Sequence, residues 1–192
     1  MTEEPTAPWR TLLDAAVDAH EGRPQARYAQ LATVRPDGRP ANRTVVVRGL
    51  LDPGGRPIVT TDSRSAKFDQ LAANPRAELC WWFPETREQF RLSGRVAIVG
   101  PDSGDDATRL RIWSELTEPS RRSFSWPAPG APRAGPPDFH QDRPAPAAPP
   151  TCFVLLVLDP EEVEHLDLRP QPHGRARYAR GPEGWLVEQV NP

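Results

Sequence analysis

The chain has 192 residues, of which 37% are hydrophobic, and it carries 24 basic and 26 acidic side chains for a formal net charge of −2. A chain of this length buries one substantial core, so we expect a single domain over residues 1–192. The near-balanced charge argues against a general nucleic-acid surface, and no apolar stretch approaches the roughly 18 residues of a membrane span.

The first residues, Met1–Pro5, are acidic and lack the basic segment and apolar run of a secretion signal. We therefore expect a soluble, cytoplasmic protein that binds neither nucleic acid nor membranes. Cys80 and Cys152 each lie within an apolar run, where a free thiol packs as a small hydrophobe more often than it forms a disulfide. No metal site is expected, because metal-ligand spacing is absent from the four histidines, His20, His140, His165 and His173.

The first half of the chain predicts a helix, a hairpin and a strand followed by a short helix. Apolar residues recur at helical spacing from Trp9 to Val17, which indicates an amphipathic helix starting near Pro8. Two strands, 28–34 and 41–48, flank a turn that has proline at its second position and form a hairpin. A third strand, 57–61, leads into a helix over 66–72 that Ser65 is expected to cap and Asn74-Pro75 to end.

The second half predicts another strand pair, a helix and four closing strands. The pair covers 77–83 and 89–99, and a helix around 107–116 is expected to be capped by the acidic segment before it. Residues 126–150 are rich in Pro, Ala and Gly, and we expect a mobile loop or lid there. The closing strands are predicted at 151–159, 162–168, 175–180 and 185–190. This order favours a mainly β (α+β) fold, a small closed or split barrel with flanking helices, since closure removes exposed strand edges.

Lys67 is the only lysine of the chain, and every other basic residue except histidine is arginine. It follows a strand and lies near a predicted helix N-terminus, where a compact ammonium suits an anion such as phosphate. Arg43 shares a strand face with Val45, and it offers a guanidinium to the same anion. A solvated strand edge with extended arginines is the alternative for the Arg43 segment taken alone.

Several motifs occur in one order along the chain: Arg43-x-Val45-x-x-Arg48, the segment Thr60–Lys67 ending in Ser-x-Lys, Asn74-Pro75, a strand bearing Gln89 and Gly94, and Arg175-x-x-Tyr178-x-Arg180 followed by Trp185. In this order they resemble the pyridoxamine 5'-phosphate oxidase-like FMN-binding split-barrel family. The resemblance covers most of residues 28–94 and the chain from Glu162 onward.

The resemblance implies a homodimer with two FMN sites between the subunits and a small-molecule substrate. It places Arg43 and Lys67 on the flavin phosphate with help from Ser65, and Thr60 and Thr61 along the ribityl chain and phosphate. Arg48 would lie near the flavin ring or the substrate, and His173 would contact the substrate. The remaining cofactor contacts implied are Thr44, Val45 and Val46 along the flavin edge, Gln89 from a neighbouring strand, and Arg175, whose charge would favour reduced flavin.

The chain also departs from the oxidases. Ala66 stands where they have arginine, Arg48 where they have lysine, and Leu166 falls roughly at their flavin-facing tryptophan. Their C-terminal Arg-Leu-His-Asp-Arg is here Gln171-Pro172-His173-Gly174-Arg175. The leading hypothesis is therefore an FMN-dependent oxidoreductase of unknown substrate. The alternatives are a non-catalytic flavin-binding or redox-sensing protein and a split barrel that holds another cofactor, such as a deazaflavin or haem.

Overall fold

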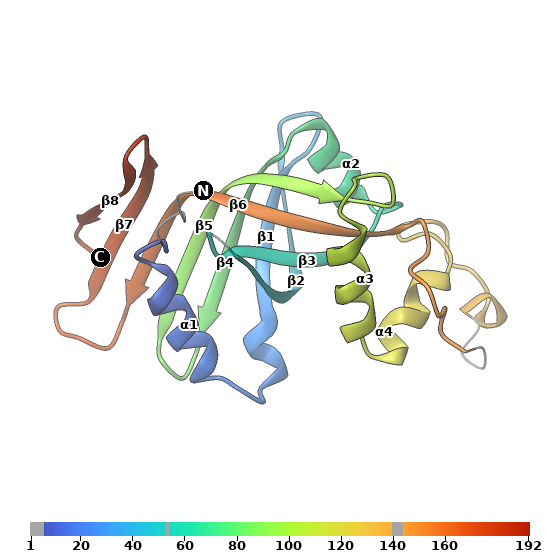
Figure 1. The fold of residues 1–192 in the computed structure, drawn as a ribbon, viewed down its shortest axis with the longest axis horizontal. Helices are drawn as coiled ribbons and strands as arrows, with labels where there is room; N and C mark the ends of the chain where they lie inside the picture. The colour runs from blue at the N-terminus through green and yellow to red at the C-terminus, as the bar shows by residue number, and fades with distance from the viewer. Residues whose placement is uncertain (1–5, 53, 140–143) are drawn as a thin grey trace.

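The computed structural model describes residues 6–52, 54–139 and 144–192, and its main feature is a closed β-barrel (Figure 1). Eight strands form one sheet in the order β3-β2-β1-β4-β5-β6-β7-β8, and pairing of β3 with β6 closes the first six into the barrel. The elements in chain order are α1 (Arg10–Asp18), η1 (Pro24–Arg27), β1 (Tyr28–Val34), β2 (Pro40–Leu51), β3 (Arg56–Asp62), α2 (Ala66–Ala73), β4 (Arg76–Phe83), β5 (Glu88–Val99), α3 (Asp106–Glu115), α4 (Glu118–Arg122), η2 (Ser123–Ser125), η3 (Pro136–Phe139), β6 (Phe153–Asp167), β7 (Gly174–Gly181) and β8 (Gly184–Gln189), where η marks a 3-10 helix.

Alternating hydrophobicity builds the barrel wall. Along β1, every second residue is buried and the others are half-buried or exposed, and the predicted strand 28–34 coincides with β1. The inward side chains of β1, β2, β4 and β5, with Trp9 and Leu13 of α1, form one core cluster in which each side chain is at most 7% exposed. Burial of each large side chain contributes on the order of 1.5–3 kcal/mol, so this cluster fixes which residues of each strand point outward.

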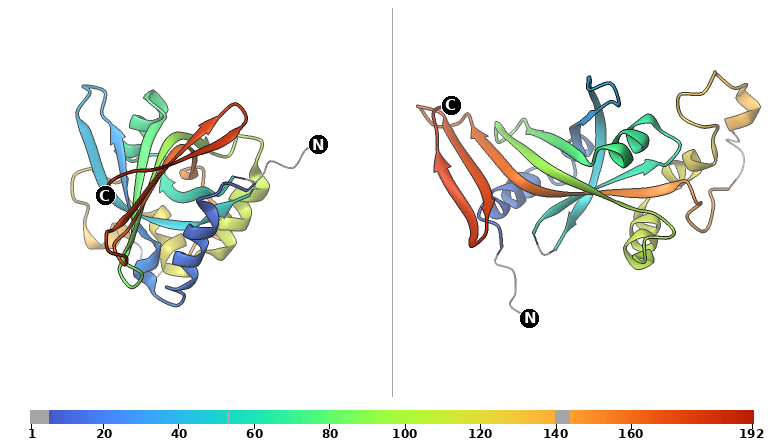
Figure 2. Two further views of the ribbon diagram at one scale, coloured as in Figure 1. Left: turned by 90° about the vertical axis from the view of Figure 1, so that its left-hand side faces the viewer. Right: turned by 90° about the horizontal axis from the view of Figure 1, so that it is seen from above.

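The helices cover different parts of the barrel. Residues of α1 pack into the barrel core, whereas Ile112 and Trp113 of α3 pack against Phe153 and Leu155 on the other face of β6. Figures 1 and 2 show β6 running the length of the molecule, from α3 and α4 at one end to β7 and β8 at the other. No helix in the described ranges combines the length and the apolar character needed to cross a membrane.

β6 differs from the prediction, because 151–159 and 162–168 are one continuous strand, Phe153–Asp167. The register against β5 shifts where Ser93 pairs with Glu162 and Gly94 with Pro160, so Glu161 is the extra residue of a bulge in β6. A Cβ on Gly94 would lie 2.0 Å from the backbone oxygen of Asp159. Glycine therefore permits the close backbone approach at which the strand bends and continues.

Two further predictions concern helix ends and the proline-rich segment. The predicted acidic cap before α3 is confirmed, since Asp105 accepts a hydrogen bond from the Thr108 amide at 3.2 Å.

The described parts of 126–150 are mostly irregular. Arg109 donates hydrogen bonds at the end of this segment, to the carbonyl oxygens of Pro150 (2.6 Å) and Phe153 (2.9 Å). Residues 140–143, including His140, lie outside the described residues, and the expected mobility of the loop stays a prediction.

Candidate anion and cofactor site

The candidate site lies where β2 and β3 separate. Their ladder runs from Leu51–Arg56 to Val47–Val59 and ends there. Beyond that point the earlier part of β2 pairs with β1, while β3 continues along β6 to Asp62. The two strands thus part beside the loop that leads into α2, and polar side chains gather at this opening.

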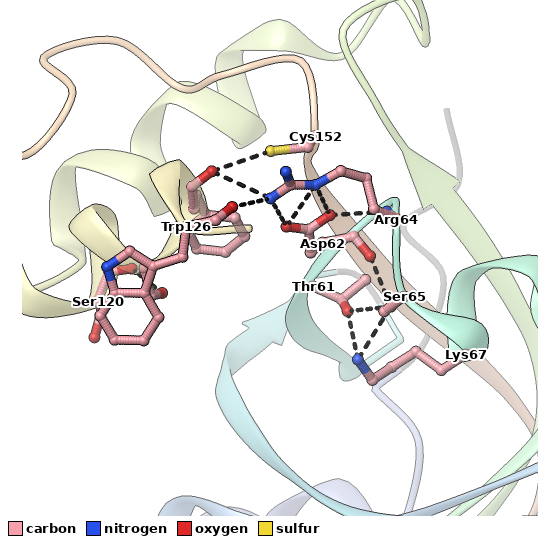
Figure 3. A network of polar contacts seen from close by, with 10 residues as sticks. Thr61, Asp62, Arg64, Ser65, Lys67, Ser120, Trp126 and Cys152 are labelled. Atoms are coloured by element: carbon pink, nitrogen blue, oxygen red, sulfur yellow. Dashed lines mark hydrogen bonds and ion pairs between the residues drawn. The ribbon is translucent and has the colours of Figure 1, made fainter. Parts of the chain in front are cut away.

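Lys67 is the centre of this group. Its Nζ donates hydrogen bonds to Thr61 Oγ1 at 2.8 Å and to Ser65 Oγ at 3.2 Å (Figure 3). Thr61 and Ser65 are buried, and the Ser65 hydroxyl donates to the backbone oxygen of Asp62 at 2.7 Å. Ser65 occupies the N-cap position of α2, but its side chain makes no capping bond, so the predicted cap is wrong. The hydroxyl is instead directed toward the Lys67 ammonium.

Arg43 reaches the same opening from β2 and is held only by neutral groups. Its Nη1 donates to Thr33 Oγ1 at 2.6 Å and to the Leu31 carbonyl oxygen at 3.1 Å, and its Nη2 donates to Gln70 Oε1 at 2.9 Å. Thr33 and Gln70 are buried and bonded to each other at 2.6 Å. The guanidinium is therefore fixed in place without being neutralised.

The two positive charges of Arg43 and Lys67 favour the binding of an anion. Burial lowers the pKa of Lys67, the nearby charge of Arg43 lowers it further, and Asp62 opposes both effects. Burial, followed by the charge of Arg35, also lowers the pKa of Arg43. Over the described ranges, no carboxylate lies within ion-pair distance of Arg43 or Lys67. Two partly buried cations with two hydroxyl groups form a donor set that suits a compact dianion such as a phosphate monoester.

The other predicted residues of β2 and β3 lie on two different faces. Val45 is 7% exposed and its side chain packs in the core, so only its backbone is available to a ligand. Arg48 is the extra residue of a bulge between Val47 and Gly49, and its Nε lies 3.4 Å from Thr60 Oγ1. Burial, and then the charge of Arg27, lowers the pKa of Arg48. The outward face of the two strands carries Thr44, Val46, Arg48 and Thr60.

Gln89 and Arg175 lie on the same outward face, farther around the sheet. The register places Gln89 opposite Leu166, and Leu166 opposite Arg175. Arg175 is already paired, with its Nη2 2.5 Å from Glu164 Oε2. Among the contacts described within one chain, none joins Gln89 or Arg175 to Lys67.

His173 is half-buried in the loop between β6 and β7, where its Nδ1 lies 3.0 Å from the carbonyl oxygen of Pro170. His165 is the buried histidine of this region, and its Nε2 lies 2.9 Å from Glu88 Oε1. The structure thus brings together Arg43, Thr61, Ser65 and Lys67, and it leaves Gln89, His173 and Arg175 apart from them. In the described part of the chain, no group of three or more potential metal ligands converges.

Sequence reasoning missed the supporting residues of the site. Thr33 and Gln70 hold Arg43 across long sequence separations, and no local pattern marks such a contact. The contact between Asp62 and Arg64 does have a local signal in the sequence, because the pattern Asp-x-Arg recurs at three turns. In each, the arginine amide and guanidinium bond the preceding aspartate, at Asp37–Arg39, Asp62–Arg64 and Asp167–Arg169.

Comparisons with known proteins give a consistent picture. The sequence model described as "Pyridoxamine 5'-phosphate oxidase, FMN-binding domain" matches residues 6–100. Pyridoxine/pyridoxamine 5'-phosphate oxidase 2 of Arabidopsis thaliana is 35% identical over 193 residues, 97% of this chain and 98% of that protein. The match to the pyridoxine/pyridoxamine 5'-phosphate oxidase of Bacteroides thetaiotaomicron is shorter, 36% identical over 56% of this chain and 49% of that protein.

The fold comparison extends over nearly the whole chain. The crystal structure of a pyridoxamine 5'-phosphate oxidase-related, FMN binding protein from Nostoc punctiforme matches with a TM-score of 0.91 and 43% identity, covering 98% of this chain and 100% of that one. The predicted fold, a mainly β split barrel of this kind, is therefore confirmed.

Proposed function

Because the chain belongs to the pyridoxamine 5'-phosphate oxidase family, we propose that it is an FMN-binding flavoprotein and an oxidoreductase. Bound FMN would supply the hydride-accepting chemistry, and the protein would supply binding, orientation and electrostatics. The substrate is a small molecule, and pyridoxamine and pyridoxine 5'-phosphate are the first candidates because the relatives are named for them.

One observation carries the proposal: Arg43 and Lys67 are two partly buried cations, near each other, with neutral hydrogen-bond partners. A structural arginine or lysine normally has its charge paired when it is withdrawn from water. A terminal phosphate would supply the missing negative charge, and the hydroxyl groups of Thr61 and Ser65 would bond its oxygens. Riboflavin has no phosphate, so this observation favours FMN over the unphosphorylated flavin.

The other predicted residues take roles that suit their positions. Thr60 and Arg48, on the outward face beside the strand opening, would contact the ribityl chain and the ring or substrate. The backbone of Thr44–Val46 would run along the flavin edge. Gln89 and Arg175 would approach the ring from a second copy of the chain.

The outward face itself supports a homodimer. Tyr28 on β1 and Trp82 on β4 are 46% and 39% exposed although both are large aromatic residues. They lie between Val46 of β2 and Gln89 of β5 on a surface of the sheet that carries predicted cofactor residues. A second copy that covers this surface would bury both aromatic side chains and enclose the flavin.

The test of the cofactor assignment is a titration of the apo-protein with FMN, riboflavin and FAD, followed by flavin fluorescence. Tight binding of FMN with much weaker binding of riboflavin supports the phosphate site. Equal affinity for FMN and riboflavin would contradict it. FAD is informative because the phosphate next to its ribityl chain is part of a diphosphate bridge and carries less negative charge than the monoester of FMN between Arg43 and Lys67.

A non-catalytic flavin-binding or redox-sensing role is the second candidate. It is favoured by the engagement of Arg175 with Glu164 and of His173 with Pro170, because Arg175 was expected at the flavin and His173 at the substrate. Anaerobic mixing of the FMN-loaded protein with pyridoxamine 5'-phosphate or pyridoxine 5'-phosphate separates the two roles. Bleaching of the flavin spectrum would support an oxidase, and an unchanged spectrum with both compounds would favour the binding or sensing role.

A further inference from the structure

Asp62 is the carboxylate that acts electrostatically on Lys67. It ends β3, directly after Thr61 and five residues before Lys67, and its side chain is 10% exposed. The Lys67 ammonium is carried on a flexible four-carbon chain and bonds Thr61, the residue next to Asp62. A free carboxylate at this position would compete with any phosphate for the ammonium.

Arg64 donates hydrogen bonds to both oxygens of the Asp62 carboxylate. The Arg64 amide donates to Asp62 Oδ1 at 2.8 Å, its Nε donates to the same atom at 2.9 Å, and its Nη2 donates to Oδ2 at 2.6 Å. Burial by itself raises the pKa of Asp62, but the bonds and charge of Arg64, followed by the charge of Lys67, outweigh burial and hold this pKa below its ordinary value. The carboxylate is thus ionised and fully engaged.

The Arg64 guanidinium is anchored away from the anion site. Its Nη2 also donates to the carbonyl oxygens of Trp126 at 3.1 Å and Phe124 at 3.4 Å (Figure 3). Figure 3 shows Trp126 on the side of Asp62 away from Lys67. The same guanidinium therefore links the carboxylate to the turn at 123–126.

We propose that Arg64 is a positioning residue that keeps Asp62 from neutralising Lys67 and so leaves the ammonium available to a phosphate. This inference deepens the proposed function and rests on it, since it concerns the same anion site. Arg64 does not touch the phosphate; it acts through Asp62.

Removing Arg64 would have two consequences for an anion. The carboxylate of Asp62 would be left partly buried and unpaired, a costly state that pairing with Lys67 relieves. Its uncompensated negative charge would also repel the incoming phosphate. Both effects depend on the charge of Asp62, so both vanish when Asp62 is replaced by asparagine.

That dependence separates positioning from a purely structural role. If Arg64 only fastens the turn at 123–126 to β3, Arg64→Ala damages the site and a second change at Asp62 does not repair it. If Arg64 restrains the carboxylate, Asp62→Asn in the Arg64→Ala background restores binding. The double variant is therefore decisive.

The experiment measures FMN affinity of the full chain near neutral pH, with melting temperature as a check on folding. Arg64→Ala should weaken FMN binding on the order of tenfold or more, the scale of one hydrogen bond to a charged group. Asp62→Asn alone should bind at least as tightly as the unmodified protein, and Arg64→Ala/Asp62→Asn should recover most of the lost affinity. Arg64→Gln serves as the second variant if Arg64→Ala does not fold.

Arg39→Ala is the matched control, because Arg39 bonds Asp37 in the same Asp-x-Arg arrangement on the surface and should leave FMN affinity unchanged. Unaltered affinity in Arg64→Ala, or a double variant as weak as Arg64→Ala, would overturn the inference. Inorganic phosphate, followed by its effect on melting temperature, is the second probe. A protein that binds phosphate but not FMN would overturn the proposed cofactor. The same Arg64 and Asp62 variants would then be compared by their affinity for phosphate.

Discussion

Replacement of Lys67 by alanine tests the anion site most directly. In the free protein the change removes hydrogen bonds to Thr61 Oγ1 and Ser65 Oγ, but these two hydroxyl oxygens already lie 3.3 Å apart and can bond each other. It also removes a partly buried charge that Arg43 repels. These effects oppose one another, so we expect the free energy of unfolding to change by no more than about 1 kcal/mol.

FMN affinity should respond much more strongly. The ammonium would give the phosphate one charge-assisted hydrogen bond, whose loss costs about 1.5–3 kcal/mol. This corresponds to a dissociation constant about 10- to 150-fold higher. Riboflavin affinity should stay the same, because riboflavin has no phosphate to contact Lys67.

The assay is a pair of fluorescence titrations, with FMN and with riboflavin, on the unmodified protein and on Lys67→Ala. Lys67→Met is the control for side-chain volume and should weaken FMN binding to a similar extent. The reasoning is refuted if FMN affinity is unchanged. It is equally refuted if FMN and riboflavin lose the same factor, because the lysine would then act on the shape of the site and not on the phosphate.

Three further predictions concern other properties. The phosphate would raise the pKa of Lys67 above its lowered value in the free protein. FMN affinity should therefore be full below that free-protein pKa and decline as the pH rises through it. Lys67→Arg should flatten the decline, and an equal decline in both proteins would exclude Lys67 as its cause. Trp82→Glu should separate the proposed homodimer into monomers in light scattering after size-exclusion chromatography, whereas an intact dimer would show that the interface lies elsewhere. Gly94→Ala should lower the free energy of unfolding by about 2 kcal/mol or more, because its Cβ would meet the Asp159 oxygen at 2.0 Å, and an unchanged denaturation midpoint would mean that the bulge relaxes.

The sequence predicted the barrel well where burial alternates. The strand 28–34 agrees with β1, and 77–83 agrees with β4 to within one residue, because one face of each packs in the core. It failed at β6, where the charged residues near Pro160 read as a turn. The strand continues there because its partner supplies Gly94, more than sixty residues earlier, and a pairing partner is not visible in the pattern of a single segment.

In the candidate site too, local features were predicted from the sequence and long-range contacts were not. Lys67 was predicted from composition and from its place between a strand and a helix, both local properties. The capping bond of Ser65 was predicted wrongly, because its hydroxyl proton goes to the backbone oxygen of Asp62 and its hydroxyl oxygen accepts from the Lys67 ammonium. The anchoring of the Arg64 guanidinium on the carbonyl oxygens of Phe124 and Trp126 depends on the turn at 123–126, which the tertiary fold brings beside β3. Contacts of this kind follow from the closure of the barrel and not from any segment alone.

The half-buried ammonium at the strand opening is also the only lysine side chain in the protein. Burial and the charge of Arg43 favour its neutral form, and the neutral amine is the form that reacts with acylating and reductive-alkylating reagents. Selective chemistry on lysine therefore falls on one position, and a bound anion would shield it. Among its side chains, the protein thus carries one amine whose reactivity reports whether the anion site is occupied.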